Sequence, residues 1–160
     1  LNVIRKKTAA LFSTCTHVAA ISVEAHPEQC EVARLFGEYI GICFQIRDDI
    51  FDYFDSAEIG KPTGNDMVEG KLTLPAIYAL NTQHIEWAND VAGKVKSGIA
   101  STDEIKRLIE FAKENGGIEY AEKTMYAYRD KAANLLNAMA DSPVKTSLMT
   151  YLDYVVDRTK

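Results

Sequence analysis

Hydrophobic side chains recur every three or four residues along most of the chain, and this spacing predicts α-helices. No segment alternates between apolar and polar residues over the length of a strand, and no dinucleotide-binding glycine motif, P-loop or fixed-period repeat occurs. The pattern therefore predicts an all-α protein built as a helical bundle. The expected helices cover residues 2–23, 27–55, 84–97, 118–140 and 143–158, with two more that begin near residues 73 and 101.

Prolines and capping residues mark where several of these helices should begin. Pro27 starts the second helix, and Pro75 lies in the first turn of the helix that follows Thr73. Ser101 or Thr102 can cap the next helix, which runs to residue 115, with an acidic residue, Glu104, close by. These signals place the helix boundaries more firmly than the hydrophobic pattern alone.

The same spacing predicts which side chains form the core. Gly37 and Gly41, four residues apart, should allow close approach of a neighbouring helix. The cysteines Cys15, Cys30 and Cys43 lie in apolar helical surroundings without metal-ligand spacing and are expected to be reduced core residues. In the last two helices the expected core positions are Ala121, Met125, Tyr128, Ala132, Leu135, Met139, Leu148, Tyr151, Leu152, Val155 and Val156.

Acidic residues interrupt the apolar pattern near the end of the second helix. Gln45, Asp48, Asp52 and Asp55 recur at intervals that share one stripe, and Asp49 lies one step round from it. Most of the positions between them are apolar or aromatic, so much of this helix should be buried. Carboxylates that lose their hydration there need a compensating cation, and a hard divalent ion such as Mg²⁺ supplies one.

The segment after this helix supplies the opposite charge. Gly60, Pro62 and Gly64 break the helix, and Lys61 and Lys71 follow on flexible backbone. A metal ion can bridge carboxylate and phosphate oxygens while ammonium groups neutralise the remaining charge. Carboxylates, magnesium and lysines together therefore predict a site for a polyanion such as diphosphate.

Two sequence motifs here carry a family resemblance. FQIRDDIFDYFD at residues 44–55, followed by GKPTGNDMVEGKLTLP at residues 60–75, resembles the second aspartate-rich motif of the trans-isoprenyl diphosphate synthases. The resemblance implies the C-terminal part of the isoprenoid synthase fold. It also implies that an allylic prenyl diphosphate ionises, is attacked by isopentenyl diphosphate and loses a proton. Under this resemblance Asp48, Asp49 and Asp52 would bind Mg²⁺ on the allylic diphosphate, and Asp48 would count as catalytic.

The resemblance extends to residues that the pattern alone would leave as ordinary surface positions. A Lys-Thr pair opens the corresponding helix in the family, and Lys7 and Thr8 match it residue for residue. It implies that Lys7 binds the allylic diphosphate and that Thr8 faces the reacting carbon. Gln45, Lys61 and Lys71 would complete the contacts with that substrate.

The resemblance covers residues 1–160 but only about half of a family member. It implies the C-terminal portion of a single polyprenyl synthetase domain whose N-terminal half is absent, so the chain alone should be inactive. The closing segments look most like long-chain, octaprenyl-type synthases of quinone side chains. A short-chain farnesyl or geranylgeranyl diphosphate synthase, a terpene cyclase and a non-catalytic partner subunit of a heterodimer remain as alternatives, although repeated aspartate disfavours a cyclase. The family implies a homodimer for the full-length protein.

Composition narrows the picture further. The chain has 160 residues, 47% of them hydrophobic, which suits one domain with a sizeable core. A formal charge of −5 without a basic stripe argues against a nucleic-acid partner. No apolar run reaches the roughly 20 residues of a membrane span, so a soluble, cytoplasmic protein is expected. The chain starts at Leu1 directly in a helical pattern, as a cleaved or shortened protein would.

Overall fold

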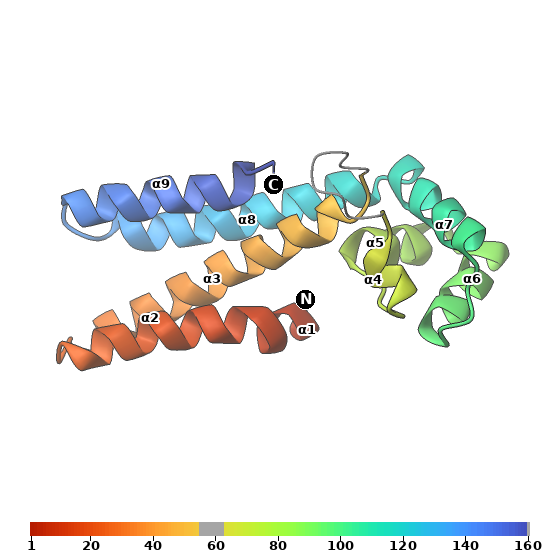
Figure 1. Cartoon of the computed structure of the whole chain (residues 1–160). Helices are drawn as coiled ribbons and strands as arrows, with labels where there is room; N and C mark the ends of the chain where they lie inside the picture. The colour runs from red at the N-terminus through yellow and green to blue at the C-terminus, as the bar shows by residue number, and fades with distance from the viewer. Residues whose placement is uncertain (55–62, 160) are drawn as a thin grey trace. The chain divides into compact units, whose positions relative to one another are not determined.

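The structure is a computed structural model that describes residues 1–54 and 63–159 (Figure 1). These residues form helices, turns and irregular segments, with no strand among them, which confirms the all-α prediction. Within the same residues, no helix has the length and apolar character that crossing a membrane requires. The elements are α1 Asn2–Ile4, the π-helical turn η1 Arg5–Ala9, α2 Ala10–Ser22, α3 Pro27–Phe51, α4 Asn65–Val68, α5 Leu74–Gln83, α6 Glu86–Lys96, α7 Thr102–Glu114, α8 Gly117–Asn137 and α9 Pro143–Asp157.

The described chain divides into two compact units. Residues 1–47 and 124–159 form the first unit, and residues 48–123 form the second. The borders fall inside α3 and α8, so each of these helices contributes residues to both units. Whether the whole chain belongs to a single domain stays a prediction.

In the first unit, η1 and α2 come close to α3 at two glycines. A Cβ atom added at Gly41 would lie 2.7 Å from the Cα atom of Ala9, and one added at Gly37 would lie 2.6 Å from the carbonyl oxygen of Phe12. Real Cβ atoms do not come this close to backbone, so both positions require glycine. The expected close approach of a neighbouring helix is therefore confirmed.

Helices α8 and α9 form the other part of the first unit and run side by side (Figure 1). The hydroxyl of Tyr126 donates a hydrogen bond to Asp157, and Arg129 forms an ion pair with Asp153. Beyond the end of α9, the carbonyl oxygen of Arg158 accepts a hydrogen bond from Arg47 Nε at 2.9 Å. The end of the chain is thereby attached to α3.

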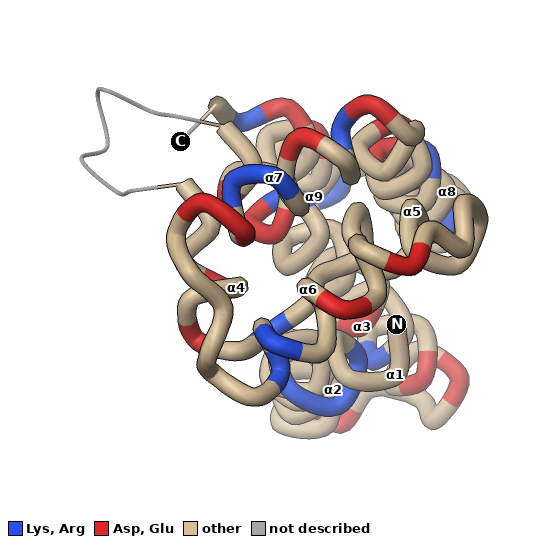
Figure 2. Tube along the Cα trace, turned by 90° about the vertical axis from the view of Figure 1, so that its right-hand side faces the viewer, with Lys and Arg blue, Asp and Glu red and all other residues tan. Residues whose placement is uncertain are grey.

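The second unit contains α4 to α7 around one hydrophobic cluster. Ser101 caps α7: its side chain accepts the N–H of Glu104, and the Glu104 carboxylate accepts the N–H of Ser101, as the sequence predicts. Acidic and basic residues are interspersed along the helices (Figure 2). The cluster is lined by Tyr53, Met67, Ala76, Ala79, Leu80, Ala88, Val91, Ala92, Val95, Ile105, Leu108, Ile109, Phe111 and Ala112.

Three sets of expectations need correction. Helix α3 ends at Phe51, four residues before the expected end at residue 55, so Asp52 follows the helix instead of lying on its acidic stripe. Cys15 is exposed, whereas Cys30 and Cys43 are buried as expected. Met139 and Tyr151 are 47% and 45% exposed, because Met139 lies beyond the end of α8 at Asn137 and Tyr151 lies on the outer side of α9. The other expected core positions of α8 and α9 are buried or half-buried.

Candidate functional site

Lys7 and Thr8 lie in the π-helical turn η1 at the beginning of the chain. A π turn inserts one extra residue into a helix, and such turns occur frequently at functional sites. Lys7 is exposed and Thr8 is half-buried, while the next residue, Ala9, is fully buried against Gly41. The regular spacing of apolar residues gave no sign of this turn.

Thr8 is joined to α3 by a hydrogen bond. Its hydroxyl donates to the side-chain oxygen of Gln45 at 2.5 Å. The contact of Ala9 with Gly41 fixes the separation of the two helices one residue further on. Two of the predicted substrate contacts, which are 37 residues apart in the sequence, are therefore brought together in the first unit.

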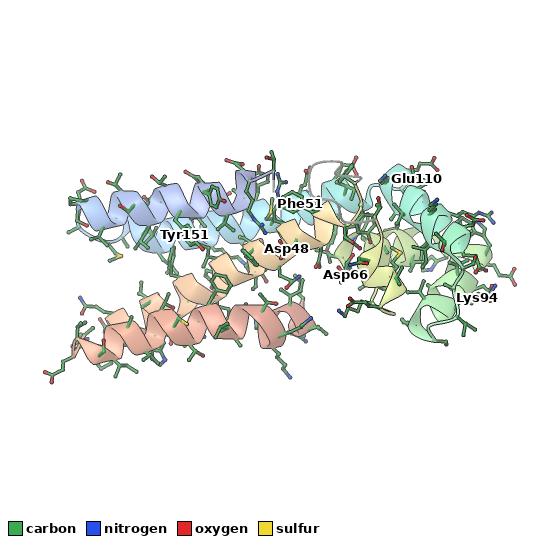
Figure 3. All side chains as sticks on the ribbon, viewed as in Figure 1. Asp48, Phe51, Asp66, Lys94, Glu110 and Tyr151 are labelled. Atoms are coloured by element: carbon green, nitrogen blue, oxygen red, sulfur yellow. The ribbon has the colours of Figure 1, made fainter. Side chains whose placement is uncertain are left out.

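Asp48 and Asp49 lie in the last turn of α3, within the second unit, where Figure 3 labels Asp48. Asp48 is half-buried and Asp49 is only 5% exposed. Their carboxylate oxygens are the donors that hard cations such as Mg²⁺ prefer. Among the described residues, no three His, Cys, Asp or Glu side chains are grouped to hold a metal. Mg²⁺ usually binds through one or two carboxylates, substrate phosphates and water, so the chemistry of this pair fits such an ion.

Asp52 follows the end of α3 and is bonded to backbone further along the chain. Its carboxylate accepts the N–H groups of Asn65 at 2.9 Å and Asp66 at 3.0 Å. Burial raises the pKa of Asp52, and the two N–H bonds act in the opposite direction. Figure 3 labels Asp66 on α4.

Lys71 lies between α4 and α5 and is exposed. Its ammonium group is 2.5 Å from the Glu69 carboxylate and 3.9 Å from that of Asp66. The hydrogen bond to Glu69 raises the pKa of Lys71, so the side chain is positively charged at neutral pH. An exposed cation of this kind can exchange a carboxylate partner for a phosphate at little cost.

The comparison with protein families identifies the family of the chain. The model of the polyprenyl synthetase family matches residues 1–112, more than half of the chain. The chain belongs to the polyprenyl synthetase family. The motifs at residues 44–55 and 60–75 lie within the matched region, so the resemblance deduced from them is confirmed.

Curated relatives of this polyprenyl synthetase chain differ in their named products. It is 34% identical to geranylfarnesyl diphosphate synthase of Aeropyrum pernix, an alignment of 100% of this chain with 50% of that protein. It is 31% identical to all-trans-nonaprenyl-diphosphate synthase of Rhodobacter capsulatus, covering 99% of the chain and 48% of the relative. It is 34% identical to heptaprenyl diphosphate synthase component 2 of Geobacillus stearothermophilus, covering 97% and 48%. The chain thus spans about half the length of these relatives.

Solved structures show the same relationship. A crystal structure of geranylgeranyl pyrophosphate synthase from Bacteroides thetaiotaomicron is 64% identical, with a TM-score of 0.94 over 98% of this chain and 52% of that chain. The corresponding enzyme of Corynebacterium glutamicum, complexed with calcium and isoprenyl diphosphate, is 32% identical, with a TM-score of 0.81 over 97% and 48%. The fold of the polyprenyl synthetase chain is therefore that of the isoprenyl diphosphate synthases.

The structure brings some of the family residues into contact with one another or with neighbouring backbone. It joins Thr8 to Gln45 in the first unit, and it ties Asp52 to the segment that leads to Lys71 in the second. Lys61, like Asp55, lies outside the described residues. The assignments of metal and substrate contacts remain predictions.

Two features of the second unit were not expected from the sequence. The hydroxyl of Tyr53, a residue interpreted only as apolar and aromatic, lies 2.9 Å from Thr73 Oγ1 and accepts the N–H of Ala76 at 3.2 Å. Burial raises the pKa of Tyr53, so the hydroxyl stays protonated. The bonds from Asp52 to Asn65 and Asp66 were also missed, because no local signal reports a partner 13 or 14 residues away. A buried tyrosine needs a partner for its hydroxyl, and this rule was the available clue.

Proposed function

We propose that this polyprenyl synthetase chain is part of a prenyltransferase that condenses an allylic prenyl diphosphate with isopentenyl diphosphate. The observation that carries the proposal is the aspartate pair in the last turn of α3, Asp48 and nearly buried Asp49, inside the segment matched by the family model. Carboxylates held at low exposure favour a bound cation over bulk water. Membership of the polyprenyl synthetase family supports diphosphate esters as the substrate class.

We propose Asp48 and Asp49 as the residues that would hold a magnesium ion. When bound, such an ion would stabilise negative charge on the leaving diphosphate. The relative from Corynebacterium glutamicum was crystallised with calcium and isoprenyl diphosphate, which supports a divalent cation here. Asp52 differs from this pair, because its carboxylate already accepts two backbone N–H groups.

The remaining predicted residues would bind and orient the allylic substrate. Lys7, Lys61 and Lys71 carry ammonium groups that would stabilise the departing diphosphate more than the intact ester, which is the requirement for faster ionisation. Thr8 and Gln45, already hydrogen-bonded to each other, would present oxygen atoms to the reacting carbon, where positive charge develops. The proton lost at the end restores the alkene of the product.

For the product, we propose a long-chain polyprenyl diphosphate of the quinone side-chain type. The named nonaprenyl and heptaprenyl synthases among the relatives support this length. A short-chain product is the second candidate, because the structure that is 64% identical belongs to a geranylgeranyl pyrophosphate synthase. The two candidates share the chemistry and differ only in how many condensations occur.

The oligomeric state and the cellular location of the full-length protein are also proposals. We propose a homodimer in the cytoplasm. The relative named component 2 supports a heterodimer as the alternative, including one with a non-catalytic subunit. Light scattering of the purified full-length protein gives its molar mass, and an assay of the same sample gives its activity. A catalytic homodimer has twice the mass of one chain and is active without any second polypeptide.

The test is an assay of the full-length protein with isotopically labelled isopentenyl diphosphate, Mg²⁺ and allylic diphosphates of increasing length. Product sizing by chromatography then distinguishes long-chain from short-chain synthesis. Asp48→Ala should lower kcat about a hundredfold or more, because an electrostatic contact with the leaving group is lost. Asp103→Ala, an exposed acidic position on α7, is the matched control and should leave the rate unchanged. Unaltered turnover in Asp48→Ala contradicts the proposed role, and elongation by the 160-residue chain alone contradicts its expected inactivity.

A further inference from the structure

Asp52 makes three hydrogen bonds to one short stretch of backbone. Its carbonyl oxygen accepts the N–H of Gly64 at 2.8 Å, and its carboxylate accepts those of Asn65 and Asp66. All four residues belong to the second unit. A single residue directly after α3 therefore holds the chain where it enters α4.

These bonds replace a missing local cap. The first N–H groups of a helix have no partner within the helix, and a side chain just before it usually accepts one of them. Gly64 stands at that position of α4 and has no side chain to do so. Its φ of 81° favours glycine, and an added Cβ atom would lie within about 3 Å of Ile105 and Ile109. Asp52 thus acts as a cap supplied from a distant part of the sequence.

Tyr53 holds the other end of the same segment. Its side chain is 1% exposed, and its hydroxyl contacts Thr73 and Ala76 at the beginning of α5. Two consecutive residues, Asp52 and Tyr53, therefore fix the backbone on both sides of residues 67–72. The intervening segment is attached at two points.

Lys71 lies between these two attachments. Its backbone N–H donates to the carbonyl oxygen of Asp66 at 2.7 Å, and Asp66 in turn donates its own N–H to Asp52. The Lys71 ammonium group forms an ion pair with Glu69, which lies three residues after Asp66 in the sequence. A continuous series of hydrogen bonds therefore connects the carboxylate of Asp52 with the position of Lys71.

We propose that Asp52 is a positioning residue, whose carboxylate holds the α4 backbone so that Lys71 is presented to the diphosphate of the substrate. Under this proposal the metal is bound through Asp48 and Asp49, and Asp52 acts on the substrate only through the backbone of residues 64–71. The inference rests on the proposed function for the role of Lys71, but the contact itself can be tested without any activity.

The kinetic test uses the full-length protein and the variants Asp52→Ala, Lys71→Ala and the double variant. Loss of a charge-assisted contact should raise KM for the allylic diphosphate about tenfold in each single variant, and the double variant should be no worse than either. The Mg²⁺ concentration that gives half-maximal activity should stay within about twofold of the original in Asp52→Ala, and should rise in Asp48→Ala. Asn65→Ala is the matched control, because it keeps the backbone N–H that bonds to Asp52.

Hydrogen exchange provides the test that is independent of catalysis. The backbone amides at positions 65 and 66 should exchange about tenfold faster in Asp52→Ala than in the original protein or in the control Asn65→Ala. Asp52→Asn, which keeps one acceptor oxygen in place, should give an intermediate rate and serves if the alanine variant does not fold.

Three results would overturn the proposal. They are a Mg²⁺ requirement raised as strongly in Asp52→Ala as in Asp48→Ala, additive effects of Asp52→Ala and Lys71→Ala on KM, and unchanged amide exchange at residues 65 and 66. An original protein that elongates no allylic diphosphate would instead remove the proposed function. The exchange result then still decides whether Asp52 holds α4.

Discussion

Helices α2 and α7 have the same length, 13 residues, but bury different kinds of side chain. Helix α7 turns Leu108, Phe111 and three other apolar residues into the hydrophobic cluster of the second unit. In α2 the buried residue is Ser13, whereas Leu11, Val18 and Ile21 are 66%, 56% and 54% exposed. Periodic apolar residues thus predict that a helix forms without showing which of its faces is covered.

The difference follows from how each helix meets its neighbour. Gly37 and Gly41 let the backbone of η1 and α2 come close to α3 at Ala9 and Phe12, and beside them the ring of Phe12 lies 5.4 Å from that of Phe44. Helix α7 instead turns large aliphatic and aromatic side chains into a shared cluster, where they meet small residues of α5 and α6 such as Ala79 and Ala88. Close backbone approach at glycines and broad burial of one apolar face are two separate ways of joining helices in this chain.

The largest effect is expected from truncating an apolar residue on each helix. Leu108 is fully buried, so Leu108→Ala should lower the free energy of unfolding by about 2–5 kcal/mol, through lost burial and a residual cavity. Leu11→Ala should change it by less than about 0.5 kcal/mol, because the side chain is already exposed. Urea unfolding followed by circular dichroism measures both. Equal losses would mean that the exposed face of α2 is covered in the protein.

A smaller effect is expected at the contact between α2 and α3. Gly41→Ala places a Cβ 2.7 Å from the Ala9 backbone and should cost about 1–3 kcal/mol, because the helices must separate. Gly93→Ala is the control: nothing lies within 4 Å of the added atom, and alanine favours a helix by roughly 0.5–1 kcal/mol. Thermal melting of both variants compares them. A neutral Gly41→Ala would show that α2 is not held by close approach.

The smallest effect concerns the beginning of α7 and depends on pH. Contacts with Lys94, and with the N–H and hydroxyl of Ser101, lower the pKa of Glu104 to about 2 from 4.5. A lowered pKa in the folded state stabilises the protein above pH 4.5, and this contribution is lost as the pH falls towards 2. The stability difference between the original protein and Glu104→Gln should therefore shrink on acidification, and also with added salt. A difference that is independent of pH contradicts the assignment.

The helices were predictable where the signals are local. Pro27 and the Ser101 cap fixed the starts of α3 and α7 correctly, because a proline or a capping box acts within one turn. The end of α3 was misplaced, because the acidic pattern continues past Phe51 while the bonds of Asp52 and Tyr53 to later segments end the helix. Tertiary contacts overrode a correct helical periodicity there.

The candidate site was predictable in composition but not in geometry. The motif around Asp48 and the Lys7–Thr8 pair indicated the family, which the comparisons confirmed. The bond between Thr8 and Gln45 was not predicted. Thr8 lies in a π turn, and the spacing of apolar residues in the sequence does not reveal that turn. Cys15 was wrongly assigned to the core, because the apolar spacing of α2 does not show which of its side chains are exposed.

The π turn at residues 5–9 also sets the rotational phase of the first helix. An inserted residue shifts the chain before it by roughly 100° about the helix axis relative to the residues of α2. Deleting one residue from this turn would restore a regular helix and rotate the side chains on its N-terminal side by the same angle about the helix axis. The turn therefore sets which side chains at the beginning of the chain meet α3, where Arg5 pairs with Glu38 and Thr8 bonds to Gln45.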